Sequence, residues 1–188
     1  MKSHVDRPQL HIFVDNSNLL IEGRRFSEMK RKRRSTLSAF KDDSYNMDWG
    51  KFLYLVKEKD ARLLGDIPIL YGSRPPPDDS VWQRIRDEGF DTKVFDRNIR
   101  NKEKGVDVEM GMDVAERLFT TPSPGVIVIA AGDADYVPAV KRAQSRDWAV
   151  EVWFWSNAAN ALKVAASRFC PLDSYLEYLR IGSKIPLP

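Results

Sequence analysis

The stretch V-I-V-I-A-A-G-D-A-D-Y, residues 126–136, decides the fold class of this 188-residue chain. Its first six residues are apolar and rich in β-branched side chains, and Gly125 and Gly132 bound them on either side. A short apolar run of this kind is typical of a central parallel strand, because such strands are buried on both faces. Gly132 permits a tight turn, so Asp133 and Asp135 come directly after the strand, where a helix is predicted to begin.

The same alternation of strand and helix extends over most of the chain. Strands are also predicted over 10–15, 67–71, 90–96 and 148–155, each of them short and apolar or alternating. Helices are predicted over 18–23, 47–64, 81–89, 107–119 and 135–146, with two short ones over 156–167 and 173–180. Alternating strands and helices favour βαβ units, so the sequence predicts an α/β fold with a mainly parallel central sheet covered on both faces.

Length and composition favour a single domain over residues 1–188. The chain is 43% hydrophobic, enough for one sizeable core. The lone Cys170 excludes an internal disulfide framework, and with only His4 and His11 a Cys/His zinc site is disfavoured. No run approaches the roughly 18 apolar residues of a membrane helix. The expectation is a cytoplasmic protein that has no membrane partner.

Positive charge is concentrated near the N-terminus. The formal net charge is +3, but the segment from Glu22 to Arg34 holds seven basic and two acidic residues. Segment 24–43 is predicted to be a flexible basic insertion. Three interpretations stay open for it: contact with a polyanion such as RNA, a solvated loop, or a nuclear import signal.

Acidic residues stand at the predicted ends of strands or starts of helices. They are Asp15 in D-N-S-N (15–18), Asp107 in K-G-V-D-V (104–108), and Asp133 with Asp135 in G-D-A-D-Y (132–136). Ligands in open α/β sheets bind outside the carboxyl ends of the strands, so these carboxylates can converge. Hard oxygen ligands select Mg²⁺ or Mn²⁺, and attack of metal-activated water on a phosphodiester is the reaction most often built on them.

Each acid also has a simpler interpretation. Asp15 and Asp107, taken singly, are more typical of helix caps, and Asp135 is assigned a cap role, which leaves Asp133 facing the cleft. Asp113 lies about 120° around its helix from Asp107, so it is assigned a supporting position.

Together these motifs resemble one family. D-N-S-N, then K-G-V-D-V-E-M-G-M-D, then V-I-A-A-G-D-A-D-Y-V-P-A-V look like the NYN-domain branch of the PIN-like ribonucleases, in the right order over residues 10–155. Tyr136 stands where the motif often has Phe. The resemblance implies a three-layer α/β/α PIN-like fold, Mg²⁺ or Mn²⁺ bound by an acidic cluster, and metal-dependent cleavage of RNA. The expectation is an endoribonuclease with single-stranded RNA as its partner, and structured RNA and DNA stay open as substrates.

Carried over residue by residue, the resemblance implies three catalytic metal ligands: Asp15, Asp107 and Asp133. Asn18, Asp113 and Asp135 take supporting positions. Basic residues beside these motifs are candidates for holding the RNA backbone: Arg24, Arg25, Arg31, Lys32, Arg33, Arg34, Arg100 and Lys104.

Other functions were weighed. A non-catalytic RNA-binding or protein-recruiting module would keep the same carboxylates. A phosphohydrolase with an aspartyl nucleophile is disfavoured because Ser17 stands where a second Asp is usual. Neither G-x-x-x-x-G-K-[ST] nor G-x-G-x-x-G occurs, so nucleoside triphosphate or dinucleotide binding has no motif support.

Overall fold

A computed structural model describes residues 8–37, 39–74, 80–96 and 104–188, without the side chains of Arg74, Asp96 and Lys104. Its centre is a six-stranded sheet in which all paired strands are parallel. The strands are β1 (Leu10–Asp15), β2 (Ile69–Arg74), β3 (Asp91–Asp96), β4 (Val126–Ala130), β5 (Ala149–Phe154) and β6 (Arg168–Pro171), in the order β3-β2-β1-β4-β5-β6. This confirms the predicted α/β class and the PIN-like fold.

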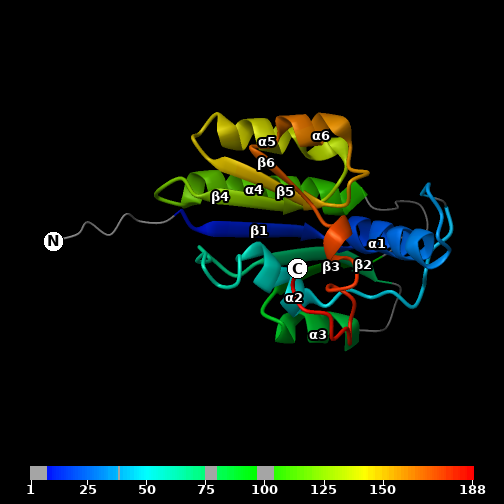
Figure 1. Ribbon diagram of the computed structural model, residues 1–188. Coiled ribbons are helices and arrows are strands. Elements are labelled where there is room, and N and C mark those ends of the chain that lie inside the picture. The colour runs from blue at the N-terminus through cyan, green and yellow to red at the C-terminus, as the bar shows by residue number, and fades with distance from the viewer. Residues whose placement is uncertain (1–7, 38, 75–79, 97–103) are drawn as a thin grey trace.

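Helices connect and flank these strands. They are α1 (Asn16–Arg31), α2 (Trp49–Val56), α3 (Ser80–Asp87), α4 (Lys104–Thr120), α5 (Val137–Gln144) and α6 (Asn160–Ala165), with single-turn 3₁₀ helices η1 (Ala134–Tyr136) and η2 (Asp173–Tyr175). Figure 1 shows β1 in the middle, α2 and α3 beside β2 and β3, and α5 and α6 beside β5 and β6.

The strand order creates a switch point between β1 and β4. From β1 the chain progresses outward through β2 to β3, then returns through α4 to β4 and progresses the other way to β6. Right-handed crossovers place the helices of the two halves on opposite faces. The segments that leave β1 and β4 therefore diverge, and a crevice opens outside the carboxyl ends of these two strands.

Strand register brings the predicted acids to that crevice. Val14 of β1 pairs with Ala130 of β4, so Asp15 and the turn at Gly132 lie at the same edge of the sheet. Both strands are buried along their whole length, as their apolar composition predicts.

All five tryptophans are buried. Trp155, after β5, donates its indole N–H to the Leu19 carbonyl of α1 at 2.8 Å and stacks on Phe26 with 5.5 Å between ring centroids. Gly23 permits this approach, because a Cβ there would lie 2.8 Å from the Trp155 ring and 2.9 Å from Tyr45. The close contact fixes α1 against the far half of the sheet.

Several predicted boundaries were wrong. The helix predicted over 47–64 ends at Val56, and Glu58, Lys59 and Asp60 have positive φ. The helix predicted from Asp107 begins at Lys104, one turn earlier. Strand β6 was not predicted, because four residues ending in proline carry almost no periodic signal.

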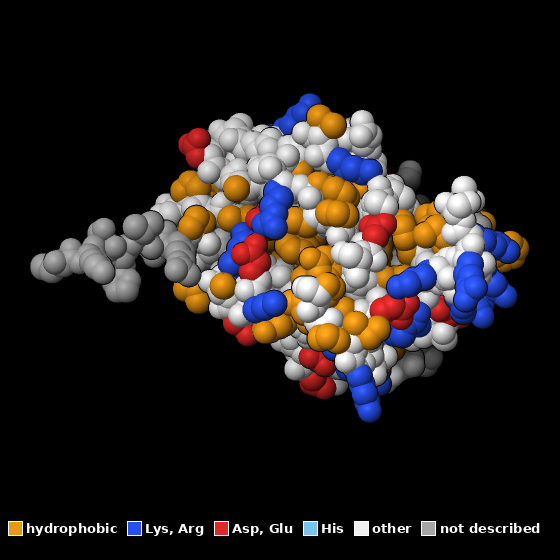
Figure 2. Space-filling view, in the orientation of Figure 1, with side chains coloured by type: hydrophobic (Ala, Val, Ile, Leu, Met, Phe, Trp, Pro, Cys, Tyr) orange, Lys and Arg blue, Asp and Glu red, His pale blue; other side chains and the backbone are white. Residues whose placement is uncertain are grey.

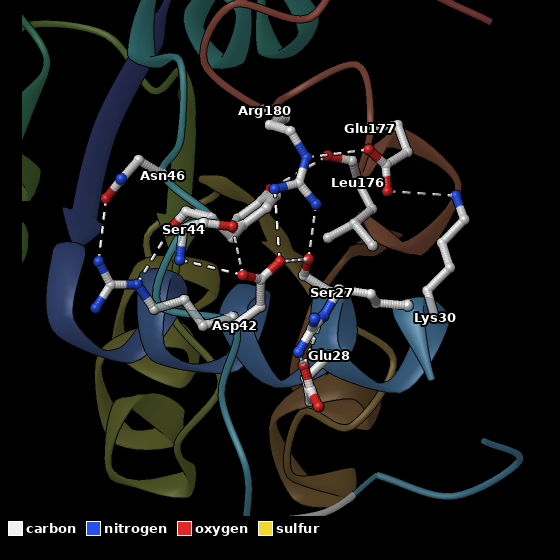
Figure 3. Close-up of polar contacts among 12 residues, drawn as sticks. Ser27, Glu28, Lys30, Asp42, Ser44, Asn46, Leu176, Glu177 and Arg180 are labelled. Carbon is white, nitrogen blue, oxygen red and sulfur yellow. Dashed lines mark hydrogen bonds and ion pairs between the residues drawn. The ribbon is translucent and has the colours of Figure 1, made fainter. Parts of the chain in front are cut away.

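The helix that begins after β1 was predicted to lose definition in the basic segment 24–43, and this is incorrect for residues 24–31. α1 continues to Arg31 and buries Phe26, Ser27 and Glu28. The far end of the segment is also anchored, as Figure 3 shows: Asp42 accepts hydrogen bonds from Ser27 and Ser44 at 2.6 and 2.5 Å. Arg180 donates to the Ser27 hydroxyl at 2.7 Å. These polar contacts attach the segment to α1 and to the C-terminal region. The hydrophobic periodicity of the sequence gives no sign of them.

Within the described residues, no helix combines the length and the apolar character that crossing a membrane requires.

Candidate metal and nucleic-acid site

Asp15 ends β1 and also caps α1. Its Oδ1 accepts the Asn18 backbone N–H at 3.0 Å, and its φ and ψ are those of an extended N-cap residue. The capping interpretation is therefore correct, but it uses only one carboxylate oxygen. The other oxygen, Oδ2, lies 3.1 Å from the Tyr136 hydroxyl.

Asn18 connects the ends of β1 and β4. Its side-chain amide donates to Asp133 Oδ2 at 2.6 Å, and its side-chain oxygen accepts the Gly132 backbone N–H at 2.8 Å. Asp133 stands at the N-cap of η1 without a capping hydrogen bond from its side chain. Asn18 therefore turns this carboxylate toward β1 and away from the helix it precedes.

Asp107 approaches from the first turn of α4, and Tyr136 places it beside Asp15. The Tyr136 hydroxyl lies 3.0 Å from Asp107 Oδ1 as well as 3.1 Å from Asp15 Oδ2. A phenol has one proton, so it donates to one of these carboxylates at a time. The other contact then brings two acceptor oxygens together, which is unfavourable unless a proton or a cation is shared.

The pKa values of Asp15 and Tyr136 are both raised at this contact. The pKa of Asp15 is raised to about 6, chiefly by burial. The charges of Asp107 and Asp133 contribute to this rise, and the hydrogen bonds from the Asn18 N–H and the Tyr136 hydroxyl oppose it. Burial and the two carboxylates also raise the pKa of Tyr136, whose hydroxyl stays protonated at neutral pH. The three acids repel one another when all are ionised.

The three acids line one cavity of about 230 Å³. Glu22 lines it too, a fourth carboxylate that the sequence analysis missed. Glu22 lies four residues after Asn18 on the same face of α1, and Asn18 lies three residues after the cap Asp15. This helical spacing is the signal that would have found Glu22. Arg25 and Asn157 donate to the two Glu22 oxygens at 2.8 and 2.6 Å, so its charge is partly neutralised.

The supporting acids Asp113 and Asp135 lie outside this cavity. Asp113 accepts a hydrogen bond from Tyr71 and pairs with Lys93 at 2.6 Å, which ties α4 to β2 and β3. Asp135 was predicted to cap a helix, but it lies inside η1 and lines a neighbouring cavity between α4 and α5. Neither residue contacts the other acids in a hydrogen bond.

Three of the eight basic residues assigned to RNA by sequence form polar contacts within the described part of the protein. Arg24 donates to the Tyr45 carbonyl at 3.0 Å, Arg25 pairs with Glu22, and Arg31 pairs with Glu28 at 2.6 Å. The exposed side chains Lys32, Arg33 and Arg34 follow the end of α1, about 25 Å along its axis from Asp15. Figure 2 shows blue side chains gathered at that right-hand end. Arg100 and the Lys104 side chain lie outside the described residues.

A larger cavity of about 550 Å³ lies between α1, α2 and α3, over Trp49 and Trp82. It is more apolar, and Asp15, Asp107 and Asp133 do not line it. This cavity is larger than the one at the carboxylates, but the converging carboxylates and the raised Asp15 pKa favour the smaller one as the chemical site.

An all-parallel sheet with carboxylates converging at its switch point is the architecture of PIN-like nucleases. The NYN domain family model matches residues 9–173, so the chain belongs to the NYN domain family, a branch of that superfamily. A search of curated proteins found no match.

Among solved structures, the chain is similar to a protein of unknown function from Vibrio parahaemolyticus. The TM-score is 0.65 at 17% sequence identity, and the match covers 92% of this chain and 96% of that one. At this identity the likeness supports the fold alone.

PIN-like nucleases typically use divalent metal ions, and the donors here suit that chemistry. All are hard carboxylate oxygens, and a cation would relieve the repulsion that raises the Asp15 pKa. In the arrangement described, no three His, Cys, Asp or Glu side chains of residues 8–37, 39–74, 80–96 and 104–188 are close enough together to enclose an ion. The chemical type of these donors therefore suits a divalent metal. In the structure the Tyr136 hydroxyl lies between two of them, Asp15 and Asp107.

Proposed function

We propose that this protein is a divalent-metal-dependent endoribonuclease. The observation that carries the proposal is the convergence of Asp15, Asp107 and Asp133 from β1, α4 and the turn after β4 on one cavity. Burial and the charges of Asp107 and Asp133 raise the pKa of Asp15. Helix capping alone does not require carboxylates from three separate elements to meet at this cost. Membership of a nuclease superfamily supports the same conclusion.

Asp15, Asp107 and Asp133 would hold Mg²⁺ or Mn²⁺. A bound ion of this kind supplies activated water and neutralises charge on the scissile phosphate. Asn18 orients the Asp133 carboxylate, and the Asp15 carboxylate is fixed by the start of α1. The Tyr136 hydroxyl keeps its proton and restrains Asp15 and Asp107. Because water would be the nucleophile, no side chain has to form a covalent bond to phosphorus.

RNA, in single-stranded form, is the proposed substrate. The cationic end of α1, with Lys32, Arg33 and Arg34, supplies positive charge at a distance from the acids. It would contribute to affinity through phosphate contacts that salt weakens.

Cleavage of circular and linear labelled single-stranded RNA by the purified protein tests the proposal. With Mn²⁺ or Mg²⁺ we expect products from both, because an endonuclease needs no free end. The controls are EDTA, the Asp133→Asn variant, and single-stranded DNA of the same sequence.

Products that persist in EDTA or in Asp133→Asn would refute the metal-dependent site. Absence of products with RNA binding retained would favour the alternative, a non-catalytic RNA-binding or protein-recruiting module.

A further inference from the structure

A groove between α4 and α5 continues from the carboxylate cavity. The cavity that Asp15, Asp107 and Asp133 line shares Asp107 with a second cavity of about 210 Å³, which Asp135, Tyr136, Pro138 and Arg142 also line. That cavity shares Pro138 and Arg142 with a third, open hollow of about 660 Å³. Through these shared lining residues the three hollows follow one another from the acids toward the surface of α5.

The far end of this α4–α5 groove is cationic. Lys141, Arg142 and Arg146 line the open hollow, together with Pro138 and Ser145. Positions 138, 141, 142, 145 and 146 recur at helical spacing, so they form one outward face of α5 and the residues that follow it. Among the described residues none of the three cations forms an ion pair, whereas Arg25 and Arg31 of α1 do.

An exposed aromatic ring contacts one of the cations that line the open hollow. Phe119, near the end of α4, has 60% of its surface exposed, and the Arg146 guanidinium carbon lies 3.7 Å from its ring centroid. Cations that follow a backbone beside an exposed aromatic ring are the combination that binds single strands, because phosphates meet the cations and a base stacks on the ring.

From this we infer that the α4–α5 groove is the path of a single RNA strand away from the carboxylate cavity, with Lys141, Arg142 and Arg146 on its phosphates and Phe119 under a base. The inference rests on the proposed function and adds a location for the strand. Charge favours RNA as the occupant over a second copy of the chain, because the hollow presents three cations and its lining includes no carboxylate.

Binding of a fluorescent single-stranded RNA, measured in EDTA with the Asp133→Asn variant as parent, tests the path without cleavage. We expect Lys141→Ala, Arg142→Ala and Arg146→Ala together to weaken binding about tenfold or more, and to lower the slope of log Kd against log salt by about 2 for three single-strand phosphate contacts. Phe119→Ala should weaken binding about tenfold while leaving the salt slope unchanged, since it removes stacking and no charge.

The matched control removes three exposed cations elsewhere: Arg84→Ala, Arg86→Ala and Lys184→Ala. Net charge falls equally in both triple variants, so equal weakening in the two would overturn the groove and leave only general electrostatic attraction. Circular dichroism confirms folding, which exposed positions should not disturb.

Failure of the groove and failure of the proposed function are distinguishable. If the parent binds RNA and the groove variants bind it equally well, the groove alone is refuted. If the parent binds no RNA, both fall. If Phe119→Ala changes the sedimentation of the protein and not its RNA affinity, the face is a contact between copies of the chain.

Discussion

Replacing Asp15 by Asn should stabilise the metal-free protein. The folded pKa of Asp15 is about 6 against an ordinary 3.8, so ionising this group at pH 7 costs the folded state about 3 kcal/mol. Asn remains uncharged, and it is among the best N-cap residues, so the bond from the Asn18 N–H survives. Allowing for imperfect amide contacts with Tyr136, we expect a gain of about 2 kcal/mol.

The gain should depend on pH in a defined direction. Below about pH 3 Asp15 is mostly protonated in both the folded and the unfolded protein, and the penalty is nearly absent. The penalty grows as pH rises from about 3 to 6 and is nearly complete at pH 7. In EDTA at pH 7, urea unfolding should show the full difference, and Tm should rise by about 4–8 °C for a chain of this length.

Asp113→Asn is the matched control, because the same chemical change should have the opposite sign. Asp113 pairs with Lys93 and accepts from Tyr71, so its neutralisation should destabilise the protein by about 1 kcal/mol. The reasoning is refuted if Asp15→Asn lowers stability at pH 7, or if its effect is the same at pH 4 as at pH 7.

The other predictions concern the parts that hold the site in place. Asn18→Ala should lower RNA cleavage about 10–100-fold, because Asp133 loses its orienting hydrogen bond, and an unchanged rate across a Mn²⁺ titration would contradict that role. Gly23→Ala should destabilise the protein by about 1–3 kcal/mol in urea unfolding, since its Cβ would overlap Trp155 and Tyr45; Gly111→Ala, whose Cβ meets no atom within 4 Å, should not. Hydrogen bonds from Ser27 and Ser44 lower the pKa of Asp42 to about 2, so Asp42→Asn should cost about 1 kcal/mol at pH 7, and the difference should shrink as pH falls below 4 toward 2; a difference constant with pH would argue against it.

Much of the fold could be predicted because its signals are local. The run 126–131 has the composition of a strand buried on both faces, and it forms the central strand β4. Helix ends and β6 were less predictable, because they depend on tertiary contacts. α1 persists through its arginines because Phe26 packs on Trp155 and Ser27 is bonded to Asp42, and neither partner is near in sequence.

The candidate site divides in the same way. Asp15, Asp107 and Asp133 could each be predicted, because each stands at an expected strand end or helix start. Parallel topology then brings them together. The role of Tyr136 could not be predicted, because a tyrosine in place of Phe gives no indication that its hydroxyl lies between two carboxylates. Formal charge alone favoured the basic run 24–34 as the RNA contact. The structure shows that Arg25 and Arg31 of this run already form ion pairs, whereas the cations of the α4–α5 groove form none with the described residues.

Anomalous diffraction from crystals of the protein grown with Mn²⁺ tests the central claim most directly. The account predicts a manganese peak in the cavity among Asp15, Asp107 and Asp133, lost in crystals of the Asp133→Asn variant. A peak elsewhere, or none while the Tyr136 hydroxyl still lies between Asp15 and Asp107, would contradict the assignment of these acids as a metal site.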